Sequence, residues 1–474
     1  MSDYAKYVGG ETSFEGGKTY KTGYVYSAVI NAALGAFFFG YVMSAFNPIG
    51  DFVQYHAFDH IIPDTLINFM TSFVPLGAGI GALSAGKIAS SLGRRKAMLL
   101  IDVIALIGTG LTLITEPYSM VFGRLIQGFC VGANSSLVPL YISEVSPSEI
   151  AGSLGTVNQL LICIGVLVAP LIGLGMPTFT AKTYSLSDSK YYKILLGGAA
   201  FAPIFRLVLS SIAFTHETPK YLVQQSKDEE ARVVLEKFYS DSRAQEELSK
   251  LRQQRDAQAE GGQLTMADVL SAKYSKRLII GIMVAVFQQL SGINAIIFFS
   301  NKIFPEDEAT VDTVIMDILQ IVATVCAGLV IEKFGRRSLL ISGMGISAII
   351  LGVFGISSLY TQSSGLKFLI WAYIFGFGFT IGPAPWIYIA DILPDVAIGM
   401  AVLGNWVSTF IIGLGFPAVA AHLGMGGGFL VFAVLSAVGT VYMFFNIKET
   451  KGKSQAEIAD MFDDSKQADA LTFA

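Results

Sequence analysis

Residues 86–99 (GKIASSLGRRKAML) and 328–340 (GLVIEKFGRRSLL) share a glycine–arginine–arginine turn, and each turn follows a long apolar run. A second related pair, 139–152 (PLYISEVSPSEIAG) and 385–399 (PWIYIADILPDVAIG), is separated by the same number of apolar runs. Repeats of this kind are typical of membrane transporters built from two related halves, with the binding site between them at mid-membrane. The sequence therefore predicts two matching bundles of helices.

The composition places these bundles in a membrane. Of the 474 residues, 53% are hydrophobic and only 14% are charged, and the mean hydropathy is +0.58. A soluble protein carries about 25% charged residues, and a helix needs about 20 apolar residues to cross a bilayer. Hydropathy predicts about twelve spans, at 24–46, 66–88, 97–115, 119–142, 153–175, 192–215, 278–301, 309–332, 338–358, 366–391, 398–421 and 427–446.

The spans divide the chain into five parts: a tail (1–23), a six-helix bundle (24–215), a linker (216–277), a second six-helix bundle (278–446) and a tail (447–474). The linker is dense in charges of both signs at i,i+4 spacing, which predicts short soluble helices. Lysines and arginines gather in the linker and after spans 2 and 8, so this side should be cytoplasmic, with both tails. The net charge of −4 is small, and we expect no nucleic-acid partner.

Polar residues interrupt the seventh span at 287–294 (FQQLSGIN). A carboxamide donates and accepts hydrogen bonds at once, which suits a neutral ligand rich in hydroxyls. Gln288 and Asn294 lie about 9 Å apart along a helix axis but about 120° apart around it. Ser291-Gly292 is a candidate bend that would let Gln288, Gln289 and Asn294 converge on a ligand. The alternative is that these amides only bond to neighbouring helices.

Seven motifs together resemble the sugar porter family of the major facilitator superfamily, over roughly residues 24–460. They are GRLIQGFCVG (123–132), PLYISEVSP (139–147), HETPKYL (216–222), QQLSGINA (288–295), EKFGRR (332–337), GPAPW (382–386) and KETKGKS (448–454). The resemblance implies the major facilitator fold, an all-α polytopic membrane protein whose two bundles are related by a pseudo-twofold axis. It also implies transport of hexoses, pentoses or polyols, by facilitated diffusion or by proton symport.

By position in the matching spans, four further residues join the predicted sugar site: Gln159, Gln320, Trp386 and Asn405. The indole of Trp386 would pack on the apolar face of a sugar ring. Gln320 stands where the family usually has asparagine. Gly378 stands where many facilitative glucose transporters have glutamate. Val42 follows Gly40-Tyr41, where the proton-coupled members carry an aspartate.

Charged loop residues form a predicted gate at the cytoplasmic ends of the spans. Its members are Arg94, Arg95, Arg124, Glu144, Glu332, Arg336, Arg337 and Asp391. We expect opposite charges to pair between the halves when the protein opens outward, and to separate when it opens inward. The alternative is that the cations only set the topology. Ala151 and Ile398 replace the loop arginines that the family carries after spans 4 and 10.

Three charged residues fall at membrane depth, where each is a candidate for a functional role. Asp102 lies near the cytoplasmic end of its span, where we expect it to reach water. Arg206 lies within the sixth span. Asp317 lies one turn before Gln320, and it is the candidate for proton coupling.

These observations predict a facilitative transporter of a monosaccharide, with a hexose first, that works by alternating access. One alternative is a proton-coupled sugar or polyol symporter that uses Asp317. Another is a sugar sensor or a structural membrane subunit of transporter shape. No nucleophile, metal cluster or phosphate loop appears in the sequence, so we expect neither an enzyme nor a cofactor or metal. We expect a monomer in a lipid bilayer, with the plasma membrane as the first candidate.

Overall fold

The computed structural model is almost entirely helical in the residues it describes, which are 19–58, 61–176, 190–261, 266–305, 308–361, 364–453 and 455–462. Eleven helical segments in these ranges are long and apolar enough to span a membrane. The longest has 50 residues and is divided at Gly424, whose φ of 72° lies in the left-handed region, so it supplies two spans. The predicted all-α fold with twelve membrane helices is confirmed.

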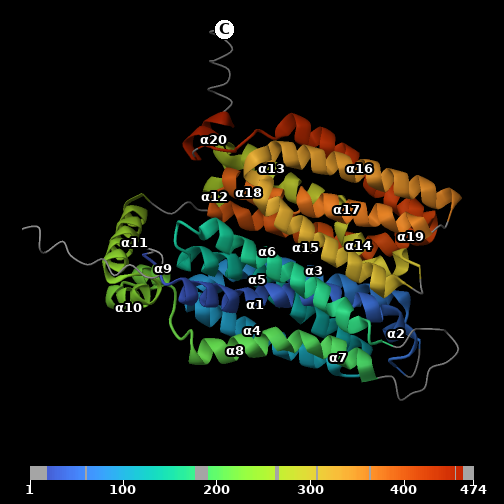
Figure 1. The fold of residues 1–474 in the computed structure, drawn as a ribbon, viewed down its shortest axis with the longest axis horizontal. Coiled ribbons are helices and arrows are strands. Elements are labelled where there is room, and N and C mark those ends of the chain that lie inside the picture. Colours follow the sequence, from blue (N-terminus) through green and yellow to red (C-terminus); the bar gives the residue numbers. More distant parts are fainter. Residues whose placement is uncertain are drawn as a thin grey trace, which may run out of the picture.

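Figure 1 shows two layers of helices, blue to green below and yellow to red above. The first half contains α1 (Thr22–Ser44), η2 (Asn47–Ile49), α2 (Gly50–Tyr55), α3 (Asp64–Leu92), α4 (Arg94–Leu113), α5 (Pro117–Val145), α6 (Ala151–Gly173), α7 (Tyr191–Gly197) and α8 (Phe201–Ile212). The second half contains α13 (Ala272–Leu290), α14 (Ile293–Ile303), α15 (Ala309–Phe334), α16 (Arg336–Tyr360), α17 (Lys367–Phe379), α18 (Ala384–Ile392) and α19 (Asp395–Asn446).

Small residues let helices within a half approach closely. A Cβ atom at Gly132 on α5 would lie 1.8 Å from the carbonyl oxygen of Ala78 on α3. A Cβ atom at Gly81 on α3 would lie 1.9 Å from the carbonyl oxygen of Phe129 on α5. Helices in a membrane associate by such close packing, because lipid supplies little hydrophobic drive between them.

Two spans of the second half are broken helices. The seventh span is α13 followed by α14, and Gly292 between them has a φ of 92°. The tenth span is α17 followed by α18, with residues 380–383 between them in turns. The predicted bend at Ser291-Gly292 is confirmed. Both breaks free backbone carbonyls that must find other donors inside the protein.

Four linker helices lie at one end of the bundle, on the left in Figure 1, and this end is called the linker end below. They are α9 (Pro219–Gln224), α10 (Asp228–Phe238), α11 (Asp241–Gly261) and α12 (Met266–Val269). The first and last described residues also lie there. Tyr20 forms a bridge with Tyr239 of the linker, and α20 (Gln455–Met461) packs on α18. The opposite end is called the far end.

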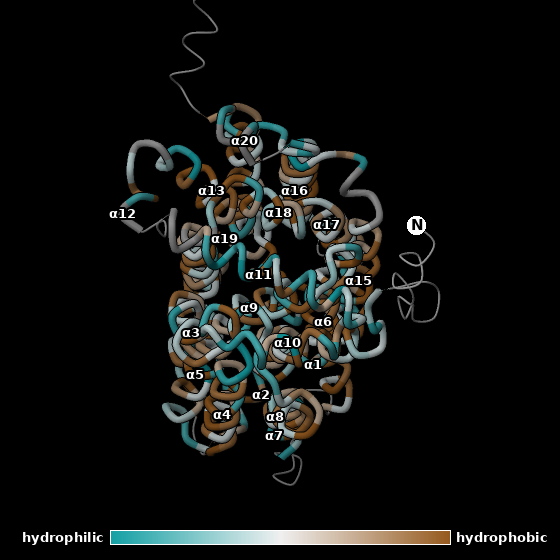
Figure 2. Tube along the Cα trace, turned by 90° about the vertical axis from the view of Figure 1, so that its left-hand side faces the viewer, coloured by the Kyte–Doolittle hydropathy of each residue, from teal (hydrophilic) through white to brown (hydrophobic). Residues whose placement is uncertain are grey.

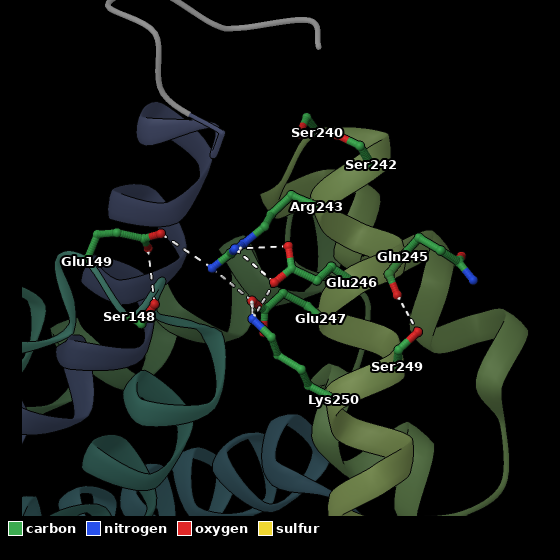
Figure 3. Close-up of polar contacts among 10 residues, drawn as sticks. All are labelled: Ser148, Glu149, Ser240, Ser242, Arg243, Gln245, Glu246, Glu247, Ser249 and Lys250. Atoms are coloured by element: carbon green, nitrogen blue, oxygen red, sulfur yellow. Dashed lines mark hydrogen bonds and ion pairs between the residues drawn. The ribbon is translucent and has the colours of Figure 1, made fainter. Parts of the chain in front are cut away.

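Figure 3 shows how the linker is attached to the first half through Arg243 on α11. Its guanidinium lies 3.4 Å from Glu149, in the loop between α5 and α6. It also lies 3.0 Å from both Glu246 and Glu247 on its own helix. Lys250 approaches Glu246 at 2.7 Å, and its hydrogen bond holds the pKa of Glu246 below the ordinary value. The linker therefore contains the predicted helices with i,i+4 charge pairs.

Figure 2 looks along the bundle from the linker end and shows hydrophilic residues gathered at the linker helices in front, with mostly apolar helices around them. Large side chains such as Ile107, Ile349 and Val434 are exposed on the outward faces. An apolar belt of this extent suits contact with lipid.

Asp102 and Arg206 form a buried ion pair inside the first half. Both Asp102 oxygens accept from Arg206, at 2.8 Å from Nε and 2.6 Å from Nη2. Asn134 Oδ1 and the Ala32 carbonyl accept the remaining Arg206 donors at 2.9 and 3.2 Å. Asp102 is 2% exposed, so the expectation that it reaches water was wrong. Packing of α4 on α8 supplies a partner instead of solvent.

Candidate functional site

The amide residues of the seventh span gather around its break. Ser291 Oγ donates to the carbonyl of Gln288 at 2.6 Å, and Tyr373 OH on α17 donates to the carbonyl of Ser291 at 2.9 Å. Gly292 follows in the left-handed conformation, which a residue with a Cβ rarely adopts. These bonds satisfy backbone carbonyls near the end of α13 and hold the bend in place.

Gln288 ties the two broken spans together. Its Nε2 donates to the carbonyls of Ile381 and Gly382, at 2.9 and 3.0 Å, in the break between α17 and α18. Its Oε1 accepts from Asn405 Nδ2 on α19 at 3.0 Å, and Asn405 also donates to the carbonyl of Ala285 at 3.2 Å. The predicted site residues Gln288 and Asn405 are thus directly bonded.

Gln289 and Asn294 form a second amide pair across the bend. Asn294 Nδ2 donates to Gln289 Oε1, and it lies 3.4 Å from Thr409 Oγ1. Thr409 donates to the carbonyl of Asn405 at 3.0 Å, which links the two pairs. All four amide residues are less than 9% exposed. The structure therefore brings Gln288, Gln289, Asn294 and Asn405 into one cluster in the second half, called the amide cluster below.

Three predicted residues lie on neighbouring helices. Gln159 on α6 donates through Nε2 to Cys163 Sγ at 3.6 Å. Gln320 on α15 lies against Gly378, and its buried Oε1 has no hydrogen-bond partner in the described part of the chain. Trp386 lies on α18, partly buried. No described hydrogen bond joins these three side chains to the amide cluster, so a shared pocket for all seven stays a prediction.

A cavity between the halves lies at the far end, with a volume of about 190 Å³. Its walls include Phe46, Asn68, Phe298, Phe299 and Phe416, and none of the seven predicted sugar-site residues. This cavity is not among the features predicted from the sequence. The paired phenylalanines of α14 and the polar residues that follow them were the available signal.

Polar contacts close the far end between the halves. Asn47 Nδ2 on η2 donates to Ser300 Oγ on α14 at 2.6 Å, and Asn47 Oδ1 accepts from the backbone N–H of Asn301 at 3.4 Å. Asp51 pairs with Lys302 at 3.2 Å. In contrast, the two ion pairs among the predicted gate residues at the linker end each form within one half.

In the first half, Arg94 pairs with Glu144 at 2.8 Å. The second oxygen of Glu144 accepts from Thr218 Oγ1 at 2.6 Å. Glu217 accepts from the backbone N–H of Arg95 at 2.9 Å, at the start of α4. The Arg95 side chain donates to the carbonyl of Phe214 at 2.7 Å.

The second half repeats this arrangement. Arg336 pairs with Asp391 at 3.3 Å, and Asp391 accepts from Thr450 Oγ1 at 2.7 Å. Glu449 accepts from the backbone N–H groups of Arg336 and Arg337, at 2.9 and 3.1 Å, at the start of α16. The Glu-Thr dipeptides 217–218 and 449–450 therefore occupy equivalent places. The repeated Glu-Thr dipeptide is a signal in the sequence for these equivalent contacts, and the sequence-based predictions did not include it.

The two remaining residues of the predicted gate are Glu332 and Arg124. The side chain of Glu332 lies outside the described residues. Arg124 is not at the linker end, because α5 begins at the far end and Arg124 lies only seven residues from that start. Its guanidinium is buried and donates to the carbonyls of Met70 and Val42, both at 2.9 Å. The prediction that Arg124 lies at the same end as the other gate residues was wrong.

Comparisons with known proteins agree with this architecture. The family model described as "Sugar (and other) transporter" matches residues 28–462. The facilitated glucose transporter member 3 of solute carrier family 2 from Oryctolagus cuniculus is 30% identical, over 94% of each chain. The glucose transporter GlcP of Staphylococcus epidermidis is 31% identical, over 91% of this chain and 96% of its own.

A solved structure of the xylose transporter XylE from E. coli, in a partially occluded inward open conformation, has the same fold. Its TM-score is 0.77 with 23% identity, and the match covers 91% of this chain and 100% of that chain. With the family model spanning most of the sequence, the chain belongs to the sugar porter family of the major facilitator superfamily, whose members are membrane transporters and not enzymes.

Proposed function

We propose that this protein carries a monosaccharide, with a hexose the first candidate, down its concentration gradient by alternating access. The observation that carries the proposal is the amide cluster, in which four carboxamides meet where two spans are broken. A neutral sugar presents hydroxyls that donate and accept, and carboxamides match both functions. Glucose as the first candidate is supported by relatives named as glucose transporters at 30–31% identity.

The polar contacts at the two ends of the bundle support a cycle in which the two halves, 24–215 and 278–446, move as rigid units. Ion pairs within each half keep the linker ends of the helices in place. Between the halves, the contacts of Asn47 with Ser300 and of Asp51 with Lys302 lie at the far end. Opening the far end would require separating Asn47 from Ser300 and Asp51 from Lys302. An exposed pair such as the latter is worth about 0–1 kcal/mol, which permits repeated opening.

Downhill transport is supported by the surroundings of Arg124. Where the proton-coupled relatives would place a carboxylate, Val42 offers Arg124 only its backbone carbonyl. A valine side chain has no charge to change with pH. Proton-coupled symport is kept as the second candidate because of one observation: Asp317 is a buried carboxylate whose two oxygens have no hydrogen-bond partner in the described residues.

Orientation and location complete the proposal. The clusters Arg94-Arg95-Lys96 and Arg336-Arg337 both lie at the linker end, which supports a cytoplasmic position for that end by the positive-inside rule. We place the protein in the plasma membrane as a functional monomer.

The test is counterflow in proteoliposomes preloaded with unlabelled sugar. Labelled glucose, fructose, xylose and inositol are offered separately, and transient uptake of a hexose is the expected result. Uptake of xylose or inositol alone would contradict the hexose assignment. No uptake of any of the four would contradict the monosaccharide proposal and favour the sensor alternative.

A further inference from the structure

Asp317 on α15 is buried, and none of the described residues forms a hydrogen bond with its carboxylate. Its side chain is 2% exposed, and both carboxyl oxygens lack a hydrogen-bond partner in the described part of the chain. It lies eight residues from the start of α15, about 12 Å along the helix from the far end. A polar group this buried normally has a hydrogen-bond partner, so Asp317 is an unusual residue in this fold.

The position of Asp317 on its helix places it between the two halves. At about 100° per residue, positions 310, 317, 324 and 328 share one face of α15 within about 40°. The other three positions of this face all lie against α6 of the first half. These contacts are Thr310 with Gly173, Thr324 with Cys163, and Gly328 with Thr156. Asp317 therefore lies in the α6–α15 contact, which joins the halves.

Among the described residues, the helices that pack most closely on α15 offer no available counter-charge to Asp317. Between Cys163 and Gly173, α6 has no charged residue. The titratable groups on the helices that contact α15 are Cys163 on α6, Lys302 on α14, Arg336, Arg337 and Tyr360 on α16, and Lys367 and Tyr373 on α17. Lys302 pairs with Asp51, and Lys367 pairs with Glu308 and with Asp312 on α15 itself. The arginines of α16 lie at the opposite end of the bundle.

We propose that Asp317 is a proton-binding site that couples closure of the far end to the pH on that side. An ionised carboxylate without a partner is strongly disfavoured inside a protein, whereas its neutral acid is not. The closed contact between α6 and α15 therefore selects the protonated form. When the far end opens, water reaches Asp317 and the proton is released to that side.

This inference rests on the alternating-access part of the proposed function, and it differs from symport. The proton enters and leaves from the far side only, so no net proton crosses the membrane. The far-side pH then sets how often the far end closes, and hence the rate of sugar entry. The final sugar distribution does not change.

The test measures opening of the far end by pulsed electron paramagnetic resonance on the full-length protein in nanodiscs. Nitroxides are attached at Ile61→Cys and Leu423→Cys, two exposed far-end positions on opposite halves, in a background with Cys130, Cys163 and Cys326 replaced by alanine. If one proton is bound on closure, raising the pH by one unit increases the open-to-closed ratio by up to about tenfold. We expect this rise, and we expect Asp317→Asn, which mimics the neutral acid, to stay closed at every pH.

Glu116→Gln is the matched control, because Glu116 is an exposed far-end carboxylate outside the contact between the halves. It should titrate like the parent protein. A parent ratio that does not change with pH, or an Asp317→Asn variant that titrates like the parent, would overturn the proposal. Asp317→Ser, which is also uncharged, checks that loss of the response does not depend on the asparagine side chain. Because this readout needs no sugar, it stands apart from the counterflow assay, whose failure would count against the proposed function alone.

Discussion

At the scale of single residues, the amide cluster shows how polar groups are accommodated in an apolar bundle. Gln288 uses both ends of its carboxamide, donating to two carbonyls in the break of the tenth span and accepting from Asn405. Each such bond is worth only about 1 kcal/mol net, but a buried partner left unpaired costs more. In the proposed sugar site, a sugar hydroxyl would replace one such bond by another of similar strength.

Replacing Gln288 by alanine should weaken sugar binding by about 1–3 kcal/mol, because the sugar hydroxyls that would bond to this carboxamide are left unpaired. The measurement is the counterflow KM and the binding constant of the purified protein. Gln224→Ala, at an exposed position of the linker helix α9, is the control and should change neither. Unchanged kinetics in both Gln288→Ala and Asn294→Ala would remove the amide cluster from the sugar site.

The Asp102–Arg206 pair should behave as a structural element. Asp102→Leu leaves the arginine charge buried and unpaired, and should lower stability by about 3–5 kcal/mol. The double variant Asp102→Leu/Arg206→Leu removes both charges and should recover most of that loss. Thermal unfolding in detergent measures all three proteins. A double variant less stable than the single one would show that the pair is needed for more than mutual neutralisation.

At the scale of elements, both halves pair the free backbone N–H groups at one helix start, that of α4 or α16, in the same way. An α-helix leaves backbone N–H groups unpaired at its start, and a carboxylate placed there accepts from them and opposes the helix dipole. Glu217 does this for α4, and Glu449 does it for α16. Because both acids come from the segment after the last span of their half, each ties the end of its bundle to the span 2–3 or 8–9 turn.

Glu217→Gln and Glu449→Gln should each lower the free energy of unfolding by about 0.5–2 kcal/mol, since the charge is lost while the shape is kept. The two losses should be similar, because the contacts are equivalent in the two halves. Asp256→Asn, at an exposed side chain on α11, is the control and should have little effect. Melting temperatures in detergent provide the comparison, and a large loss from one variant with none from the other would contradict the equivalence.

At the scale of the whole molecule, the groups that bind and release a proton during the cycle decide whether a proton gradient can drive sugar uphill. A ligand or proton shifts a conformational equilibrium only through different affinities for the two conformations. Val42 cannot titrate, and Arg124 beside it bonds to backbone carbonyls. A proton cycle through Asp317 alone returns the proton to the side it came from.

Reconstituted protein given a pH gradient, acidic at the far side, should therefore not accumulate labelled sugar on either side. The assay begins with equal sugar concentrations on both sides and follows the label with time. A protonophore should leave the final level unchanged. Uphill uptake that collapses with the protonophore would establish symport, and its loss in Asp317→Asn would assign the coupling to that residue.

The sequence by itself determined the membrane class, the twelve spans and the twofold repeat, because a bilayer demands about 20 apolar residues per span wherever the helix packs. It also located the bend at Gly292, since the unfavourable conformation belongs to the residue itself. The partners of charged groups depended on the tertiary structure. Asp102 and Arg206 are 104 positions apart, and only the packing of α4 on α8 brings them together. The assembly of the helices decides three further features for the same reason. These are the contacts of Arg124, the pairing of gate charges within each half, and the burial of Asp317 where α15 packs on α6.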